Sequence, residues 1–157
     1  MQKTNVMRLL DTAGIRYSVR EYAVDESDLS ALHAAELIGI PAEQVFKTLV
    51  LQGGSGIYAV CCIPAAAELD LKKTARAAGE KNMDLVPVKN IQPLTGYVRG
   101  GCSPMGMKKQ YPTYLDETAQ LFDTISVSAG ERGVQVILSP EDLARFINAG
   151  FYDIVKM

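Results

Sequence analysis

Two separated stretches of the chain carry groups that can stabilise a negative charge on a ligand. The first is Lys47, inside the apolar run Val45–Leu51, and the second is Gly96–Gly106, which holds four glycines and one proline in eleven residues. A lysine ammonium group and free backbone N–H groups can both hold an oxyanion, a carbonyl oxygen or a phosphate. If the fold brings the two stretches together, they predict a binding or catalytic site.

The glycine-rich stretch predicts a shaped loop. Glycine opens backbone angles that other residues avoid, while Pro104 fixes its own φ and keeps Ser103 extended. The stretch matches neither the phosphate loop that ends in Gly-Lys-Ser/Thr nor the Gly-x-Gly-x-x-Gly pattern of dinucleotide sites. Its composition alone also allows an ordinary tight turn.

Lys47 is out of place for a strand residue, because alternation puts it on the same face as Leu49 and Leu51. Lysine is rarely buried without a partner. One interpretation is a lysine at an exposed sheet edge. The other is a charge at the rim of an apolar pocket, where it hydrogen-bonds a substrate oxygen and where desolvation biases its titration.

The other residues of catalytic type form no familiar triad or metal site. His33 is the only histidine, and the cysteines, Cys61, Cys62 and Cys102, form no Cys-x-x-Cys pair. Adjacent strand residues point to opposite faces, so Cys61 and Cys62 do not readily share a metal. We therefore expect free thiols, no metal and no cofactor, and we expect neither Cys102 nor Ser103 to act as a nucleophile.

Composition limits the class of protein. The 157 residues are 48% hydrophobic and 22% charged, with a net charge of −2, as expected for one soluble globular domain over residues 1–157. Apolar runs such as Ile57–Pro64 are too short to cross a bilayer, and Met1–Asn5 lacks an apolar signal core. We expect a cytoplasmic protein whose surface does not attract nucleic acid everywhere.

Helical and strand patterns are mixed along the chain without strict alternation. Apolar spacing and capping residues predict helices over 4–14, 30–39, 68–79, 88–95 and 139–150, the last closed by Gly150. Strands are predicted over 15–22, 45–51, 57–63, 83–86, 111–116, 124–128, 134–138 and 151–155, with two hairpins, 45–63 and 124–138. This order favours an α+β domain with a mixed sheet.

Four segments in this order carry a family resemblance: Val45–Leu49, Leu69–Lys73, Thr95–Gly106 and Val127–Gly133. Over nearly the whole chain they resemble the YbaK/EbsC family of aminoacyl-tRNA deacylases, relatives of the editing domain of bacterial prolyl-tRNA synthetase. The resemblance implies a mixed β-sheet with a barrel-like core and surrounding helices. It also implies hydrolysis of a mischarged tRNA, cysteinyl-tRNA(Pro) above all, because a synthetase pocket discriminates poorly between small amino acids.

The resemblance also implies roles for single residues. The family's essential lysine maps onto Lys47 and its Gly-x-x-x-Pro loop onto Gly100–Pro104. Amides near Gly101 and Cys102 would hold the ester carbonyl, Lys47 would contact the carbonyl or the terminal ribose, and the substrate's own thiol would attack. The pocket residues implied by the family pattern are Tyr22, Thr48, Gly100, Ser103, Pro104 and Ser128.

The sequence departs from the family pattern at two places. Gln135 stands where some relatives carry an acid, and Leu29-Ser30 stands where an aromatic residue occurs in them. The resemblance therefore implies the reaction more firmly than it implies the amino acid. A deacylase for alanyl- or seryl-tRNA and a non-catalytic module that binds tRNA or a synthetase remain as alternatives.

Basic residues supply a candidate tRNA surface. They are Lys72, Lys73, Arg76, Lys81, Lys108 and Lys109. A solvated helix face is the alternative for the first three. Because the net charge is low, help in delivering the tRNA is expected, and the resemblance implies prolyl-tRNA synthetase as that partner.

Overall fold

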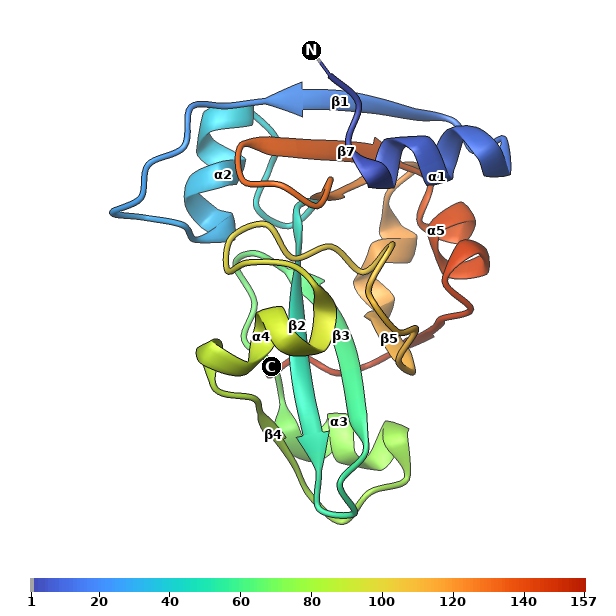
Figure 1. Cartoon of the computed structure of the whole chain (residues 1–157). Coiled ribbons are helices and arrows are strands. Elements are labelled where there is room, and N and C mark those ends of the chain that lie inside the picture. The colour runs from blue at the N-terminus through green and yellow to red at the C-terminus, as the bar shows by residue number, and fades with distance from the viewer. Residues whose placement is uncertain (1) are drawn as a thin grey trace.

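Eight strands and five α-helices position the candidate residues within residues 2–157, which the computed structural model describes (Figure 1). The helices are α1 Asn5–Ala13, α2 Ala31–Ile38, α3 Leu71–Ala78, α4 Ile91–Thr95 and α5 Pro140–Phe146, with short 3-10 helices η1 Val88–Asn90 and η2 Glu117–Leu121. The strands are β1 Tyr17–Glu21, β2 Phe46–Gly53, β3 Tyr58–Pro64, β4 Met83–Leu85, β5 Thr113–Asp116, β6 Ile125–Ser128, β7 Val134–Leu138 and β8 Gly150–Tyr152.

The strands form two sheets. An antiparallel sheet has the order β1-β7-β6, and a mixed sheet has the order β4-β2-β3-β5-β8, with β5 parallel to both β3 and β8. A bridge between Val45 and Ser126 connects the sheets where β2 begins. The predicted α+β class and both hairpins are confirmed, although the strands of residues 2–157 stay in two sheets and close no barrel.

Local signals set the ends of the helices near the predicted site. Ser30 Oγ accepts the His33 N–H at 3.2 Å and begins α2, and Asp70 Oδ1 accepts the Lys73 N–H at 3.0 Å and begins α3. Such caps satisfy N–H groups that have no partner within the helix. The Arg20 guanidinium donates to Ile38 O at 2.9 Å and ties the end of α2 to β1.

The predicted last helix, 139–150, is too long. Helix α5 ends at Phe146, and Gly150 begins β8 instead of closing the helix. The left-handed turn falls on Asn148, whose φ is 53°. Asparagine tolerates this conformation better than most residues other than glycine, so the chain can turn before the glycine is reached.

The β2–β3 hairpin lies between two hydrophobic cores. Phe46 and Cys62 pack into the core that α1, α5 and the three-stranded sheet enclose, whereas Leu51, Cys61 and Ile63 pack into the core beside α3. Neighbouring strand residues thus face different cores, as the alternation of side chains requires. Lys47 lies near the start of β2, close to the junction of the two sheets.

None of the helices in residues 2–157 combines the length and the apolar character that crossing a membrane would need.

A buried carboxylate helps to hold the C-terminal segment in place, and its removal provides a test of the fold. Asp116 is fully buried, and it accepts the Ile154 N–H at 3.1 Å and the Thr118 N–H at 3.2 Å. We expect Asp116→Ala to lower the free energy of unfolding by about 3 kcal/mol, because it leaves buried donors unpaired. Urea denaturation measures this, with the exposed Asp84→Ala as the control. Equal stability of the two variants would contradict the assignment.

Candidate functional site

Lys47 and the glycine-rich loop border one pocket. The pocket has a volume of about 120 Å³. Its lining residues are Tyr22, Leu29, Ser30, Ala31, Ala34, Phe46, Lys47, Thr48, Gly100, Cys102, Ser128 and Gln135. The predicted convergence of Lys47 with the Gly100–Pro104 segment on one cleft is therefore confirmed at Gly100 and Cys102.

Five parts of the fold supply the lining residues, and the glycine-rich loop is one of them. Tyr22 directly follows β1, and its N–H donates to Gly133 O at 2.9 Å, which joins it to the β6–β7 turn. Helix α2 and the residues before it supply one wall, and the start of β2 supplies Lys47 and Thr48. Ser128 and Gln135 lie opposite each other in the β6–β7 pair.

Lys47 is a half-buried cation without a carboxylate partner. Its Nζ donates to the carbonyl oxygen of Ala65 at 3.2 Å, and within residues 2–157 it forms no ion pair closer than 4 Å. Burial lowers the pKa of Lys47 below its ordinary value, and the more distant Glu68 carboxylate opposes this shift. An ammonium group has three N–H donors, so Lys47 keeps donors for a ligand.

The glycine-rich loop needs glycine at two adjacent positions. Gly100 has a φ of 86°, and a Cβ there would lie 3.3 Å from the Leu29 Cβ. A Cβ on Gly101 would lie 3.1 Å from the Arg132 backbone nitrogen, so the loop packs against the β6–β7 turn through bare backbone. The Arg132 Nε–H also donates to the Arg99 carbonyl oxygen at 2.8 Å.

The N–H groups of Gly101 and Cys102 differ in whether they already donate a hydrogen bond within the protein. The Gly101 N–H donates to Val98 O at 3.0 Å and is thereby used inside the loop. The Cys102 N–H has no acceptor in the part of the chain that the structure describes. Of the two amides expected to hold an ester carbonyl, Cys102 offers the free donor in this conformation.

Ser103 and Pro104 do not line the pocket. Both are buried, and the Ser103 Oγ accepts the Met105 N–H at 3.3 Å. The structure therefore does not bring these two predicted substrate-binding residues to the pocket surface.

Gln135 and Ser128 make the pocket wall polar. Gln135 is only 6% exposed, and its Oε1 accepts the Ser126 hydroxyl at 2.8 Å. Its Nε2 group donates no hydrogen bond within residues 2–157, so its two N–H donors remain available to a ligand. The Ser128 Oγ accepts the Gly130 N–H at 3.1 Å, which leaves its own O–H free to donate.

The helix α2 contribution was missed by the sequence interpretation. Ala31 and Ala34 line the pocket together with Phe46. Two small residues three positions apart share one helix face, which was the available signal. Alanine carries no reactive group, however, and only its position opposite β2 makes it part of the site.

The candidate tRNA cations separate into two groups. Lys73 Nζ contacts Asp153 Oδ1 at 3.0 Å and Val155 O at 2.9 Å, so this lysine holds the C-terminal segment. The other candidates have exposed side chains: Lys72, Arg76, Lys81, Lys108 and Lys109. Lys72 and Arg76 lie on α3, Lys81 lies in the turn after α3, and Lys108 and Lys109 follow the glycine-rich loop in the sequence.

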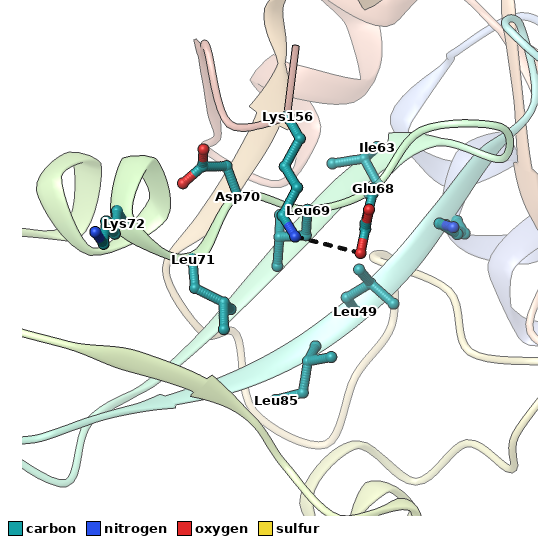
Figure 2. A pocket seen from close by; sticks show the side chains of 10 residues that line it. Leu49, Ile63, Glu68, Leu69, Asp70, Leu71, Lys72, Leu85 and Lys156 are labelled. Carbon is teal, nitrogen blue, oxygen red and sulfur yellow. Dashed lines mark hydrogen bonds and ion pairs between the residues drawn. The ribbon is translucent and has the colours of Figure 1, made fainter.

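Lys47 also borders a second, larger cavity of about 530 Å³, shown in Figure 2. We name it the leucine groove. It is lined by Lys47, Leu49, Ile63, Glu68, Leu69, Asp70, Leu71, Lys72, Leu85 and Lys156. Leu49 and Lys47 border it together, as expected of residues on the same face of β2.

The Cys102 thiol is poorly suited to act as a nucleophile. Burial raises its pKa to about 11, and a hydrogen bond with Thr95 opposes the shift. The His33 ring lies 3.6 Å from carboxylate oxygens of Asp25 and Glu36 and does not line the pocket. Among residues 2–157, no cluster of three metal-ligating side chains is found.

Thiol labelling tests this assignment. Because the thiolate is the reactive form and the folded-state pKa of Cys102 is raised, we expect iodoacetamide to modify the native protein slowly at pH 7. The rate should rise toward pH 10, and urea should make all three thiols reactive at pH 7. Mass spectrometry of the peptide that contains Cys102 measures the rate. Rapid modification of Cys102 in the native protein at pH 7 would contradict a neutral buried thiol.

The sequence of this chain is similar to those of known proteins. The family model for the aminoacyl-tRNA editing domain matches residues 26–146. A relative from Enterococcus faecalis, "Putative Cys-tRNA(Pro)/Cys-tRNA(Cys) deacylase EbsC", is 47% identical over 98% of this chain and 93% of its own length. The uncharacterized protein YwhH of Bacillus subtilis is 29% identical over 81% of this chain and 82% of its own.

A solved structure has the same fold. It is described as "a putative trans-editing enzyme for prolyl tRNA synthetase" and superimposes with a TM-score of 0.83 at 25% identity, covering 99% of this chain and all of the other. The family match includes α2, β2, the glycine-rich loop and the β6–β7 pair, which supply every lining residue of the pocket except Tyr22. The chain belongs to the aminoacyl-tRNA editing domain family.

Proposed function

We propose that this chain is a deacylase that hydrolyses mischarged aminoacyl-tRNA in trans, with cysteinyl-tRNA(Pro) as its principal substrate. The observation that carries the proposal is that Lys47 and Cys102, whose N–H has no acceptor among the described residues, line one small pocket. Membership of the editing family and the name of the Enterococcus relative support the reaction class. We take residues 1–157 to act as one editing unit.

The pocket dimensions favour a small aminoacyl group. A volume of about 120 Å³ is well below the roughly 300–1,000 Å³ typical of pockets for drug-sized ligands. Ala31, Ala34 and Gly100 supply short or absent side chains, while Thr48 and Ser128 supply hydroxyl groups. One short side chain with a polar end fits this combination of size and polarity.

The mechanism needs no nucleophile from the protein. In the proposed step the substrate thiol attacks its own ester carbonyl, an S–C bond forms, and the C–O bond to the terminal ribose breaks. The ribose oxygen takes up the thiol proton, and water then opens the cyclic thioester to free cysteine. Lys47 and the Cys102 N–H stabilise the negative charge that develops on the carbonyl oxygen, and the pocket holds the thiol close to the carbonyl.

Removal of the Lys47 ammonium group is the first test. We expect Lys47→Ala to lower kcat/KM for cysteinyl-tRNA(Pro) by about 100-fold or more, the usual effect of losing one such donor. Thermal unfolding should be nearly unchanged, because Lys47 makes one backbone hydrogen bond and no ion pair within the described residues. Lys89→Ala, an exposed lysine on η1, is the matched control. A folded Lys47→Ala variant with wild-type turnover would exclude this role.

A panel of charged tRNAs tests the amino-acid specificity. If the substrate thiol is the nucleophile, cysteinyl-tRNA(Pro) should be hydrolysed at least about tenfold faster than the alanyl form, which has no nucleophile in its side chain. Seryl-tRNA should be intermediate, since a hydroxyl is a weaker nucleophile than a thiol. Equal rates for cysteinyl- and alanyl-tRNA would contradict the thiol mechanism, and intact substrate despite measurable tRNA binding would favour a non-catalytic module.

The same assay tests the proposed helper. The net charge of −2 provides little general attraction for tRNA, so we propose that prolyl-tRNA synthetase assists its delivery. Added synthetase should raise the deacylation rate at low enzyme concentration, and added salt should reduce it. A rate that responds to neither would contradict the helper and the phosphate contacts together.

A further inference from the structure

The leucine groove has no role in the reaction described above, yet it adjoins the reacting centre. It extends from Lys47 over β2 and α3 toward β4, and Figure 2 shows Leu49, Leu69, Leu71 and Leu85 facing into it. We propose that the leucine groove binds the 3′-terminal adenosine that carries the aminoacyl ester. This inference rests on the proposed deacylase function, because it names the subsite for the leaving half of that substrate.

The shared lysine places the groove on the substrate's path. Lys47 lines both the 120 Å³ pocket and the leucine groove. An ester carbonyl held at Lys47 has an aminoacyl side chain on one side and a ribose on the other. If the aminoacyl side chain occupies the small pocket, the ribose and its base must lie on the other side of the carbonyl. The leucine groove is the other cavity that Lys47 borders.

The size of the groove fits a nucleoside. Its volume of about 530 Å³ lies within the roughly 300–1,000 Å³ typical of ligand pockets, whereas the small pocket falls below that range. The two cavities therefore divide an aminoacyl-adenosine into unequal parts. The short aminoacyl side chain matches the smaller cavity, and the nucleoside matches the larger one.

The apolar lining suits the face of a base. Leu71 and Leu85 are 36% and 52% exposed, so both leave apolar surface in water when the groove is empty. Ile63 and Leu69, which also line the groove, are buried. A flat heterocycle lying on these side chains would remove apolar surface from water without requiring a specific base edge.

The charges at the rim suit the phosphates that precede the terminal nucleoside. Lys72 forms no ion pair among residues 2–157. Lys156 Nζ lies 3.3 Å from Glu68 Oε1, and the dashed line in Figure 2 marks this ion pair. The Asp70 carboxylate is engaged as the cap of α3. Three cations, Lys47, Lys72 and Lys156, thus outnumber the two carboxylates that line the groove, and the net charge of its rim is positive. The Glu68 carboxylate can accept a hydrogen bond from a ribose hydroxyl.

Steady-state kinetics test the groove with Leu71→Ser, Leu85→Ser and the double variant. These side chains are exposed and lie outside the small pocket, so we expect kcat for cysteinyl-tRNA(Pro) within about twofold of wild type. KM should rise roughly tenfold in the double variant, because polar side chains replace the apolar surface that the base would cover. Leu121→Ser, a change at an exposed leucine on η2, is the matched control. An unchanged KM in a folded double variant would overturn the proposal.

A binding experiment gives a readout that does not depend on turnover. Titration of the wild-type chain with adenosine 5′-monophosphate should shift the leucine methyl resonances of Leu71 and Leu85 saturably, and that of Leu121 should stay unchanged. Loss of these shifts in the double variant would support the groove. Absence of any shift at Leu71 and Leu85 at millimolar nucleotide would overturn it.

The outcomes separate this inference from the deacylase function. Wild-type protein that leaves every aminoacyl-tRNA intact contradicts the function, while nucleotide-induced shifts at Leu71 and Leu85 would still support a nucleoside groove. Active wild type with unchanged KM in the double variant contradicts the groove alone. If the double variant keeps its KM for tRNA but loses stimulation by the synthetase, the groove docks a protein segment and the adenosine assignment is overturned.

Discussion

A single ammonium group that is partly removed from water constrains the arrangement of this site. Lys47 stands near the start of β2, next to the bridge that joins the two sheets, and its one hydrogen bond goes to the Ala65 carbonyl oxygen. A carboxylate close by would neutralise it, and full burial would favour its neutral form. The position between two cavities keeps the charge accessible to a ligand.

The second constraint is the close approach of backbone to backbone beside that charge. Gly100 and Gly101 let the loop lie against Leu29 and the β6–β7 turn at distances that leave little room for a Cβ. The Arg132–Arg99 hydrogen bond holds the same contact. Cys102 follows these glycines and lines the pocket, and its N–H has no acceptor within the described chain. Pre-organised donors of this kind are effective because they need no rearrangement when charge develops.

The two cavities lie on opposite faces of β2, because successive side chains along the strand point to opposite faces. Lys47 and Leu49 face the leucine groove, whereas Thr48 turns to the small pocket and approaches the Cys62 sulfur at 3.8 Å. Lys47 also lines the small pocket, so this residue near the beginning of β2 borders both cavities. One strand thereby separates a polar pocket of small volume from an apolar groove of larger volume.

The sequence by itself determined most elements of the fold and pointed to both segments, around Lys47 and around Gly100, that border the candidate pocket. Capping serines and aspartates, helical spacing and β-branched runs predicted the helices and hairpins, because these signals act over a few neighbouring residues. The end of the last helix was predicted wrongly at Gly150, since Asn148 also tolerates a left-handed turn. Tertiary structure alone decided that Ala31 and Ala34 border the pocket, that the Gly101 amide is used within its loop, and that Lys73 binds Asp153. These features depend on contacts between segments far apart in the chain, and no local pattern of residues encodes such contacts.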